Sequence, residues 1–130
     1  MSIRLFIIDD HAIVIDGIKA LLKEEKEIEV VGGAEDGEEA LRLIPALKPD
    51  VVLTDIQMPG ADGVHVVRRV RDTPTLEQTP ILVTTAFGTG TATFALQLGA
   101  NAYEPKPLNP QSFLATVERL LKSQNTKKAA

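Results

Sequence analysis

The feature that most constrains the fold is a regular alternation between short apolar runs and stretches with helical periodicity. The runs at residues 3–8, 51–54 and 81–84 are apolar at nearly every position, which is typical of strands that are buried on both faces of a parallel sheet, and the segments at residues 29–33 and 102–104 are shorter candidate strands. The intervening stretches repeat apolar residues three or four positions apart, which favours helices with one buried face. The runs occupy residues 3–8, 29–33, 51–54, 81–84 and 102–104, and the helical patterns lie around residues 14–22, 37–47, 64–71, 94–98 and 110–121.

These β-then-α units predict a single α/β domain, because strands that alternate with helices form a parallel sheet covered on both faces. We expect a flavodoxin-like, doubly wound sheet of five parallel strands in the order 2-1-3-4-5, with five helices. The domain is predicted to span residues 1–122. Residues 123–130 are polar or small, and we expect them to form a flexible tail or the start of a linker.

Periodicity also predicts which side chains of the helices are buried. In the first helix Val14, Ile18, Leu21 and Leu22 fall on one side, and we expect that side to face the core. Charged side chains away from such faces are expected in solvent, and a lone histidine is expected at the surface. The residues expected in solvent on these grounds are His11, Arg68, Arg69 and Arg71.

Composition excludes several classes of function. The net charge of −4 argues against nucleic acid as a direct partner, because phosphate binding is driven by Lys and Arg. The chain has no cysteine, which excludes disulfides, thiol catalysis and thiolate-bound metal. No apolar stretch approaches the roughly 20 residues of a membrane helix, and the N-terminus has no signal-peptide pattern. We therefore expect a cytoplasmic protein without a membrane partner.

Acidic residues follow two of the predicted strands. Asp9 and Asp10 come directly after the first strand, and Asp55 comes directly after the third. In the expected order these strands are neighbours, and their carboxyl ends flank the point where ligands bind in open α/β sheets. Three carboxylates placed together repel one another and need a cation or a shared proton. Mg2+ prefers such oxygen ligands, and the backbone carbonyl of Gln57 is well placed to complete the site.

Two further strand ends carry groups suited to phosphoryl chemistry. With a metal bound, Asp55 stays ionised and is a competent nucleophile toward a phosphoryl group. The transferred group then needs donors and positive charge around its oxygens. Thr85 supplies a hydroxyl and Lys106 an ammonium group, while Thr84 is a rival for the hydroxyl role.

Taken in order, these residues closely resemble the receiver domain of response regulators in two-component signalling, of the CheY-like superfamily. The resemblance spans residues 3 to about 121. Each motif is weak alone, but the order and spacing of all of them are specific. The motifs are Asp9-Asp10, Asp55 before Met58-Pro59-Gly60 and Asp62-Gly63, Thr85-Ala86, Gly99-Ala100 and Lys106-Pro107.

The resemblance implies a role for each residue at the acidic edge. Asp55 is expected to accept a phosphoryl group from a sensor histidine kinase or a phosphotransfer protein. Mg2+ is expected at Asp9, Asp10, Asp55 and the Gln57 carbonyl, and Lys106 is expected to pair with the phosphate. The domain would catalyse only its own phosphorylation and dephosphorylation, so we do not expect an enzyme that acts on other substrates.

The resemblance also implies how the signal leaves the domain. Thr85 would move to hydrogen-bond the phosphate, and Tyr103 would turn inward with it as an aromatic switch. The fourth helix, fifth strand and fifth helix would form the surface for an output domain or effector, and a phosphorylation-induced homodimer is compatible with that surface.

Three other functions are weighed against this one. A phosphohydrolase of the haloacid-dehalogenase type also uses an aspartate at a strand end, but its second aspartate is replaced here by Gln57. A flavin carrier needs a loop that cradles phosphate after the first strand, where Asp9 and Asp10 would repel it. The third alternative is a receiver-shaped interaction module that works without phosphorylation.

Overall fold

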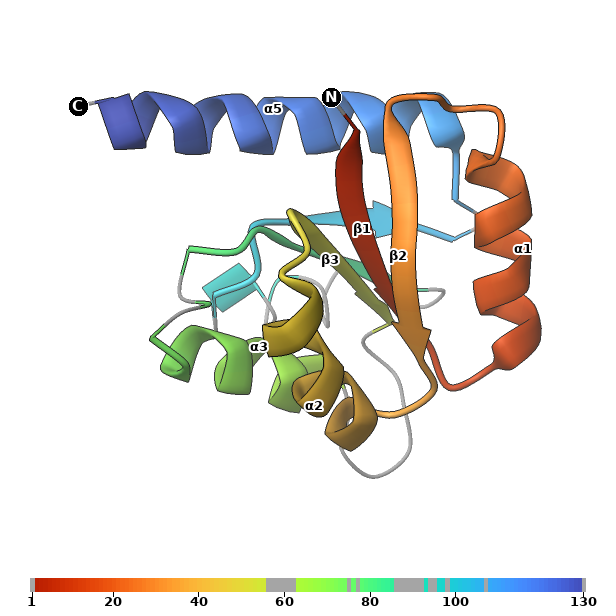
Figure 1. Cartoon of the computed structure of the whole chain (residues 1–130), viewed down its shortest axis with the longest axis horizontal. Helices are drawn as coiled ribbons and strands as arrows, with labels where there is room; N and C mark the ends of the chain where they lie inside the picture. Colours follow the sequence, from red (N-terminus) through yellow and green to blue (C-terminus); the bar gives the residue numbers. More distant parts are fainter. Residues whose placement is uncertain are drawn as a thin grey trace.

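Five parallel strands form one sheet in the order β2-β1-β3-β4-β5 (Figure 1). The structure is a computed structural model that describes residues 2–55, 63–74, 76, 78–85, 93, 96–97, 99–106 and 108–129. The predicted fold class and strand order are confirmed. The strands are β1 (Ile3–Ile8), β2 (Ile28–Ala34), β3 (Val51–Asp55), β4 (Ile81–Thr85) and β5 (Ala102–Pro105).

Helices connect the strands and cover both faces of the sheet. The helices with printed bounds are α1 (Ala12–Leu22), α2 (Gly37–Leu47), α3 (Gly63–Asp72) and α5 (Pro110–Ala129). The expected helix at residues 94–98 falls largely outside the described residues, although Thr93, Leu96 and Gln97 are helical. Because α5 continues to Ala129 and extends past the sheet (Figure 1), the domain boundary at residue 122 stays a prediction.

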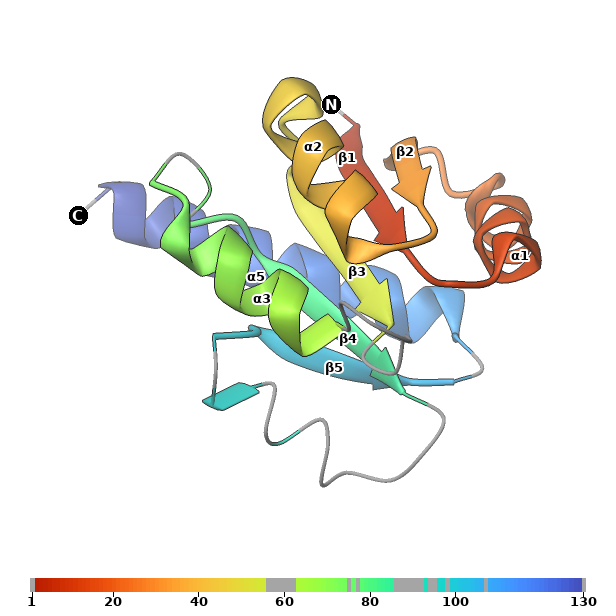
Figure 2. The same cartoon turned by 90° about the horizontal axis from the view of Figure 1, so that it is seen from below.

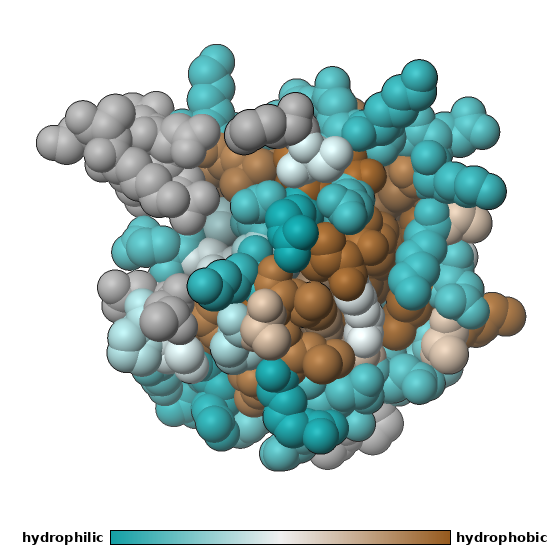
Figure 3. Space-filling model, in the orientation of Figure 1, coloured by the Kyte–Doolittle hydropathy of each residue, from teal (hydrophilic) through white to brown (hydrophobic). Residues whose placement is uncertain are grey.

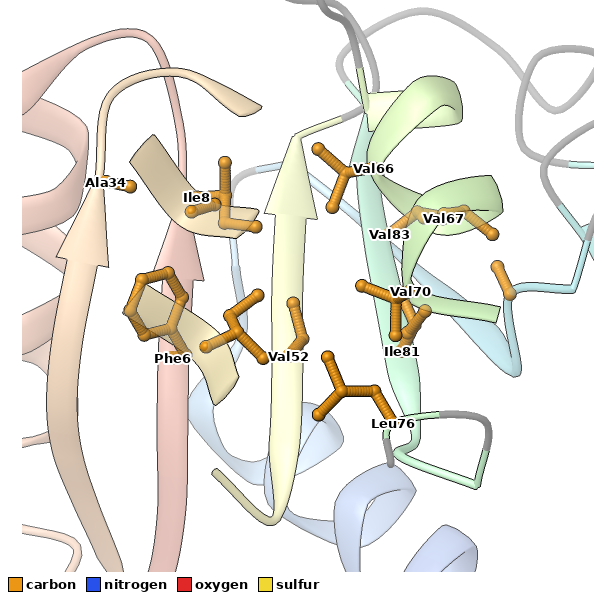
Figure 4. Close-up of a cluster of buried hydrophobic side chains, with 13 residues drawn as sticks. Phe6, Ile8, Ala34, Val52, Val66, Val67, Val70, Leu76, Ile81 and Val83 are labelled. Atoms are coloured by element: carbon orange, nitrogen blue, oxygen red, sulfur yellow. The ribbon is translucent and has the colours of Figure 1, made fainter. Parts of the chain in front are cut away.

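The core has two halves, one on each face of the sheet. Figure 2 shows the sheet between its helices from a second direction, with α2 and α3 on one side and α5 on the other. Successive residues of β1 point to opposite faces, so Phe6 and Ile8 join one cluster while Leu5 and Ile7 join the other. The first cluster packs under α2 and α3, and the second under α1 and α5. Figure 4 shows the first cluster, which includes Phe6, Ile8, Ala34, Val52, Val66, Val67, Val70, Leu76, Ile81 and Val83.

The buried side of α1 differs from the one that its periodicity predicts. Ile18 and Leu22 are buried as expected, but Ile15 is buried with them and Leu21 is 42% exposed. The prediction for Leu21 was therefore wrong. The reason is that α1 carries apolar residues on more than half of its circumference, and only packing against the sheet selects which of them turn inward.

Arg71 is not the solvated side chain that the sequence suggests. Its Nε donates to the Gly99 carbonyl at 2.9 Å, Nη1 donates to the Thr79 carbonyl at 2.7 Å, and Nη2 donates to Asn101 Oδ1 at 2.6 Å. Burial lowers the pKa of this guanidinium from its ordinary value. Arg71 therefore ties the end of α3 to the segments that lead into β4 and β5.

Gly99 makes this contact possible. Its φ of +125° lies in the region that side chains rarely adopt, and a Cβ there would stand 2.9 Å from Arg71 Cγ.

The surface of the domain is mixed in character. Figure 3 shows hydrophobic residues near the centre of the face that carries β1 and β2, with hydrophilic residues around them. β2 is an edge strand, and its residues 30–33 are only half-buried. Within the described part of the chain, every helix is too short or too polar to cross a membrane.

Candidate functional site

The acidic residues converge at the carboxyl edge of the sheet. Ile8 of β1 lies beside Thr54 of β3, so the residues that follow each of them, Asp9 and Asp55, are brought together. Both carboxylates are buried. From β1 the chain adds β2 on one side and β3 on the other, so the strand order changes direction at this point. In open α/β sheets, ligands bind at the carboxyl edge of such a point.

Lys106 lies between the two buried acids. It follows β5, and its Nζ is 3.1 Å from Asp9 Oδ2 and 3.4 Å from Asp55 Oδ2. The side chain is 26% exposed, so the ammonium group is partly shielded from water. Charges that are buried with a partner at this distance interact strongly, because water screens them poorly. Residues from three separate strand ends therefore form one ion-pair cluster.

The cluster alters the proton affinity of the lysine. Burial lowers the pKa of Lys106, but the hydrogen bond to Asp9 and the charges of Asp55 and Asp9 act the other way. Together these attractions outweigh burial, and the pKa of Lys106 stands above its ordinary value. The amine is therefore a cation at neutral pH.

Asp10 and His11 form the outer part of the site. The His11 backbone N–H donates to Asp9 Oδ1 at 3.0 Å, which holds the turn from β1 into α1. The imidazole Nδ1 lies 2.9 Å from Asp10 Oδ1 and 3.4 Å from Asp9 Oδ1. His11 is 64% exposed, so it lies at the surface as expected, but the sequence did not predict its contact with the acids.

The donor set fits a hard divalent cation. Ligand atoms of Asp9, Asp10 and His11 lie within 4.8 Å of one another. Asp10 Oδ1 is enclosed, and apart from the His11 Nδ1 contact at 2.9 Å no partner is found for it among the described residues, so a lone pair remains available. Carboxylate oxygens are the ligands that Mg2+ prefers. The side chains of Asp9 and Asp10 are therefore suitable for holding such an ion beside Asp55.

Of the remaining predicted site residues, the structure describes some and not others. Thr85 ends β4, but its side chain and all of Gln57 lie outside what the structure describes. Thr84, the rival to Thr85, is buried and lies opposite Asp55 in the pairing of β3 with β4. Tyr103 is 37% exposed on β5, so its ring is partly in solvent.

Sequence reasoning missed a buried carboxylate next to the predicted switch. Glu104 is buried in β5 and accepts hydrogen bonds from Thr116 Oγ1 at 2.6 Å and Ser112 Oγ at 3.1 Å. Both hydroxyls belong to α5, and they lie four residues apart on one side of that helix. The alternation of β5, which puts Glu104 on the same side as Ala102, was the available signal.

We expect Thr116→Val to lower the free energy of unfolding by about 1–2 kcal/mol, because Glu104 loses its shortest hydrogen bond while the side-chain volume is kept. Urea unfolding followed by circular dichroism measures the change. The matched control is Thr73→Val, which removes a solvent-exposed hydrogen bond to the Arg69 carbonyl. Equal effects of the two substitutions would show that Glu104 does not depend on α5.

Comparison with known proteins identifies the family. A family model described as the response regulator receiver domain matches residues 5–118. The chain therefore belongs to the response regulator receiver domain family, and the resemblance seen in the motifs is confirmed.

The relatives agree in fold and sequence. A protein-glutamate methylesterase/protein-glutamine glutaminase of Trichodesmium erythraeum is 38% identical over 122 residues, which are 92% of this chain and 34% of that protein. The transcriptional regulatory protein YhcZ of Bacillus subtilis is 37% identical over 87% of this chain and 52% of its own length. A two-component response regulator of the LuxR family from Aurantimonas sp. SI85-9A1 superposes with a TM-score of 0.85 at 31% identity, over 95% of this chain and 87% of that one.

Both curated relatives are longer than this chain, and each match covers most of the chain but only part of the relative. The chain spans about a third of the length of the first and about half of the second. What these sequence matches have in common with the chain is thus the receiver portion.

Proposed function

We propose that this domain is a phosphorylation-dependent signalling switch that accepts a phosphoryl group on Asp55 from a sensor histidine kinase or a phosphotransfer protein. The observation that carries the proposal is the position of Lys106 Nζ, which contacts both Asp9 and Asp55. A cation in that place can pair with phosphate oxygens once Asp55 is modified. The family match supports the same assignment.

In the proposed transfer, the carboxylate of Asp55 is the nucleophile. An Asp55 oxygen forms the new O–P bond while the bond from phosphorus to the donor nitrogen breaks. The electron pair of that bond stays on the donor imidazole, which leaves as a neutral ring because its other nitrogen carries a proton. Lys106 lies close enough to offset the negative charge that is carried to Asp55, because its Nζ is already within 3.4 Å of that side chain.

Mg2+ is the cofactor that this donor set favours. Asp9, Asp10, Asp55 and the backbone carbonyl of Gln57 would hold it. When bound, the ion supplies positive charge that neutralises the oxygens of the transferred group. Asp9 also holds Lys106, so the same carboxylate serves both cations.

The response would pass from the site to the opposite side of β5. Thr85 would hydrogen-bond the phosphate, and Tyr103, which is partly exposed, would turn inward as the switch. The face formed by the fourth helix, β5 and α5 would then contact an output domain or effector, or a second phosphorylated copy. We propose residues 1–122 as the receiver unit, with residues 123–130 leading to a tail or linker, and we place its work in the cytoplasm.

Mass spectrometry of the intact protein tests the proposal directly. With Mg2+ and acetyl phosphate, we expect the wild-type chain to gain one phosphoryl group and Asp55→Asn to gain none. Asp16→Asn, an exposed acid on α1, is the matched control and should be modified like the wild type. Modification that persists in Asp55→Asn would refute the acceptor assignment. Turnover of external phosphoesters would favour a hydrolase, and a lack of any modification would favour a phosphorylation-independent module.

A further inference from the structure

The turn that connects β1 to α1 carries three potential metal ligands in a row (Figure 1). Asp9, Asp10 and His11 each offer one ligand atom, and these atoms all lie within 4.8 Å of one another. Among the described residues this is the only such group of acidic and histidine side chains. His11 is the member that a magnesium site built from oxygen ligands does not need, because Mg2+ prefers carboxylates and water.

The two oxygens of Asp9 have different partners. Oδ2 lies 3.1 Å from Lys106 Nζ, whereas Oδ1 accepts from the His11 backbone N–H at 3.0 Å. Oδ1 is also the oxygen that lies 3.4 Å from the ring Nδ1 of His11. The lysine and the imidazole therefore contact different oxygens of one carboxylate, and an ion held on the Oδ1 side need not break the contact with Lys106.

Asp10 Oδ1 is the second oxygen that faces the ring. It lies 2.9 Å from His11 Nδ1, yet within the described part of the chain this enclosed oxygen accepts no hydrogen bond. An enclosed carboxylate oxygen without a hydrogen bond is uncommon, because it has lost water and gained nothing in exchange. A cation shared by the oxygen and the ring nitrogen would satisfy both atoms.

The two distances from the ring nitrogen match the spacing of ligands on one ion. Zn2+ holds imidazole nitrogen and carboxylate oxygen at about 2.1 Å. Two ligands at that distance are about 3.0 Å apart at a right angle and about 3.4 Å apart at the tetrahedral angle. Nδ1 lies 2.9 Å from Asp10 Oδ1 and 3.4 Å from Asp9 Oδ1. The imidazole is therefore already at the separation from both oxygens that a shared ion requires.

We propose that His11 is a third side-chain ligand of this site, and that the site therefore binds a divalent transition-metal ion such as Zn2+ or Ni2+ more tightly than Mg2+. Imidazole nitrogen suits Zn2+ and Ni2+, whereas Mg2+ gains little from it. His11 is 64% exposed, so an ion can reach the ring from solvent and keep water at its other positions. This inference rests on the proposed function only in sharing the carboxylates of Asp9 and Asp10, and it does not require phosphorylation.

Isothermal titration calorimetry with Ni2+ alone and with Mg2+ alone tests the selectivity. The wild type should bind Ni2+ more tightly than Mg2+. His11→Gln keeps the backbone N–H that Asp9 accepts, and it should reduce the ratio of Ni2+ to Mg2+ affinity at least about tenfold. The matched control is His65→Gln on α3, which changes the other histidine of the chain and should keep the wild-type ratio. An unchanged ratio in His11→Gln, or an equal reduction in His65→Gln, would overturn the proposal.

Nuclear magnetic resonance of the wild-type chain provides an independent measurement. Ni2+ is paramagnetic, so small additions should shift or broaden the ring protons of His11 before those of His65. A His11 ring that stays unaffected while Ni2+ binds would also overturn the proposal. Neither measurement uses a phosphodonor, so both are separate from the acetyl phosphate assay on the wild type. A chain that is modified at Asp55 but shows no dependence of Ni2+ binding on His11 would overturn this inference alone, and a chain with the reverse behaviour would overturn the proposed function alone.

Discussion

Lys106→Met is expected to lower the free energy of unfolding by about 2 kcal/mol in metal-free buffer. The substitution keeps an unbranched apolar stem but removes the positive charge 3.1 Å from Asp9 and 3.4 Å from Asp55. Both carboxylates are buried, so their repulsion is poorly screened once the cation is gone. We choose a value below that for a fully buried pair because Lys106 is 26% exposed. Chemical denaturation followed by circular dichroism measures the difference.

Two controls separate the loss of charge from a general effect of the substitution. Lys19→Met changes an exposed lysine on α1, and we expect a change within about 0.5 kcal/mol. Mg2+ should narrow the gap between wild type and Lys106→Met, because a divalent cation at Asp9 and Asp10 replaces the missing positive charge. A destabilisation that is equal in Lys19→Met, or that Mg2+ leaves unchanged, would contradict the proposed balance of charges.

The pH dependence of this difference has a definite sign. The folded pKa of Lys106 lies above its ordinary value of 10.5, so its contribution to stability is complete below the unfolded pKa. The contribution is lost as pH rises through the folded pKa. The gap between wild type and Lys106→Met should therefore be constant from neutral pH to about pH 9 and should shrink in more alkaline buffer. A gap that widens above pH 10.5 would have the wrong sign.

Arg71→Ala is expected to lower the free energy of unfolding by about 3 kcal/mol. The truncation removes three charge-assisted hydrogen bonds, which end on the Thr79 carbonyl, the Gly99 carbonyl and Asn101 Oδ1. Asn101 Oδ1 also accepts from the Ile81 N–H at 2.8 Å, so the arginine supports the start of β4 as well. Thermal and urea unfolding should both report the loss.

The matched control for this prediction is Arg68→Ala on the exposed side of the same helix. We expect its effect to stay within about 0.5 kcal/mol, because its side chain lies in solvent. Similar losses for the two variants would mean that Arg71 is no more important than any arginine on α3. Because Gly99 and Asn101, which Arg71 holds, lead directly into β5, amide exchange in β5 should also rise in Arg71→Ala alone.

Local sequence was enough for the parts of the site that lie at strand ends. Asp9, Asp10 and Lys106 follow segments that were predicted as strands, and Asp55 ends another of them. Once the sheet is parallel and has the order 2-1-3-4-5, the carboxyl ends of neighbouring strands meet at one edge. The contacts of Lys106 with Asp9 and Asp55 follow from that geometry. The roles of these residues in phosphorylation stay predictions.

Other contacts had no signal of this kind. The carboxylate of Glu104 has its partners on α5, and Arg71 has its partners near β4 and β5. A polar side chain can be satisfied by solvent or by a distant segment, and periodicity does not distinguish these outcomes. The burial of Ile15 in place of Leu21 has a similar cause, since several apolar residues of α1 compete for one buried side.

The sequence by itself determined the alternating α/β architecture, the order of the strands, the family and the acids at the carboxyl edge of the sheet. These features follow from periodicity and from motifs, which are properties of residues close together in the chain. Only the tertiary structure decided the depth to which Asp9 and Asp55 are buried, the partners of Arg71 and Glu104, and the side of α1 that stays in solvent. Those features depend on how segments far apart in sequence pack together, and packing is a cooperative property of the whole domain.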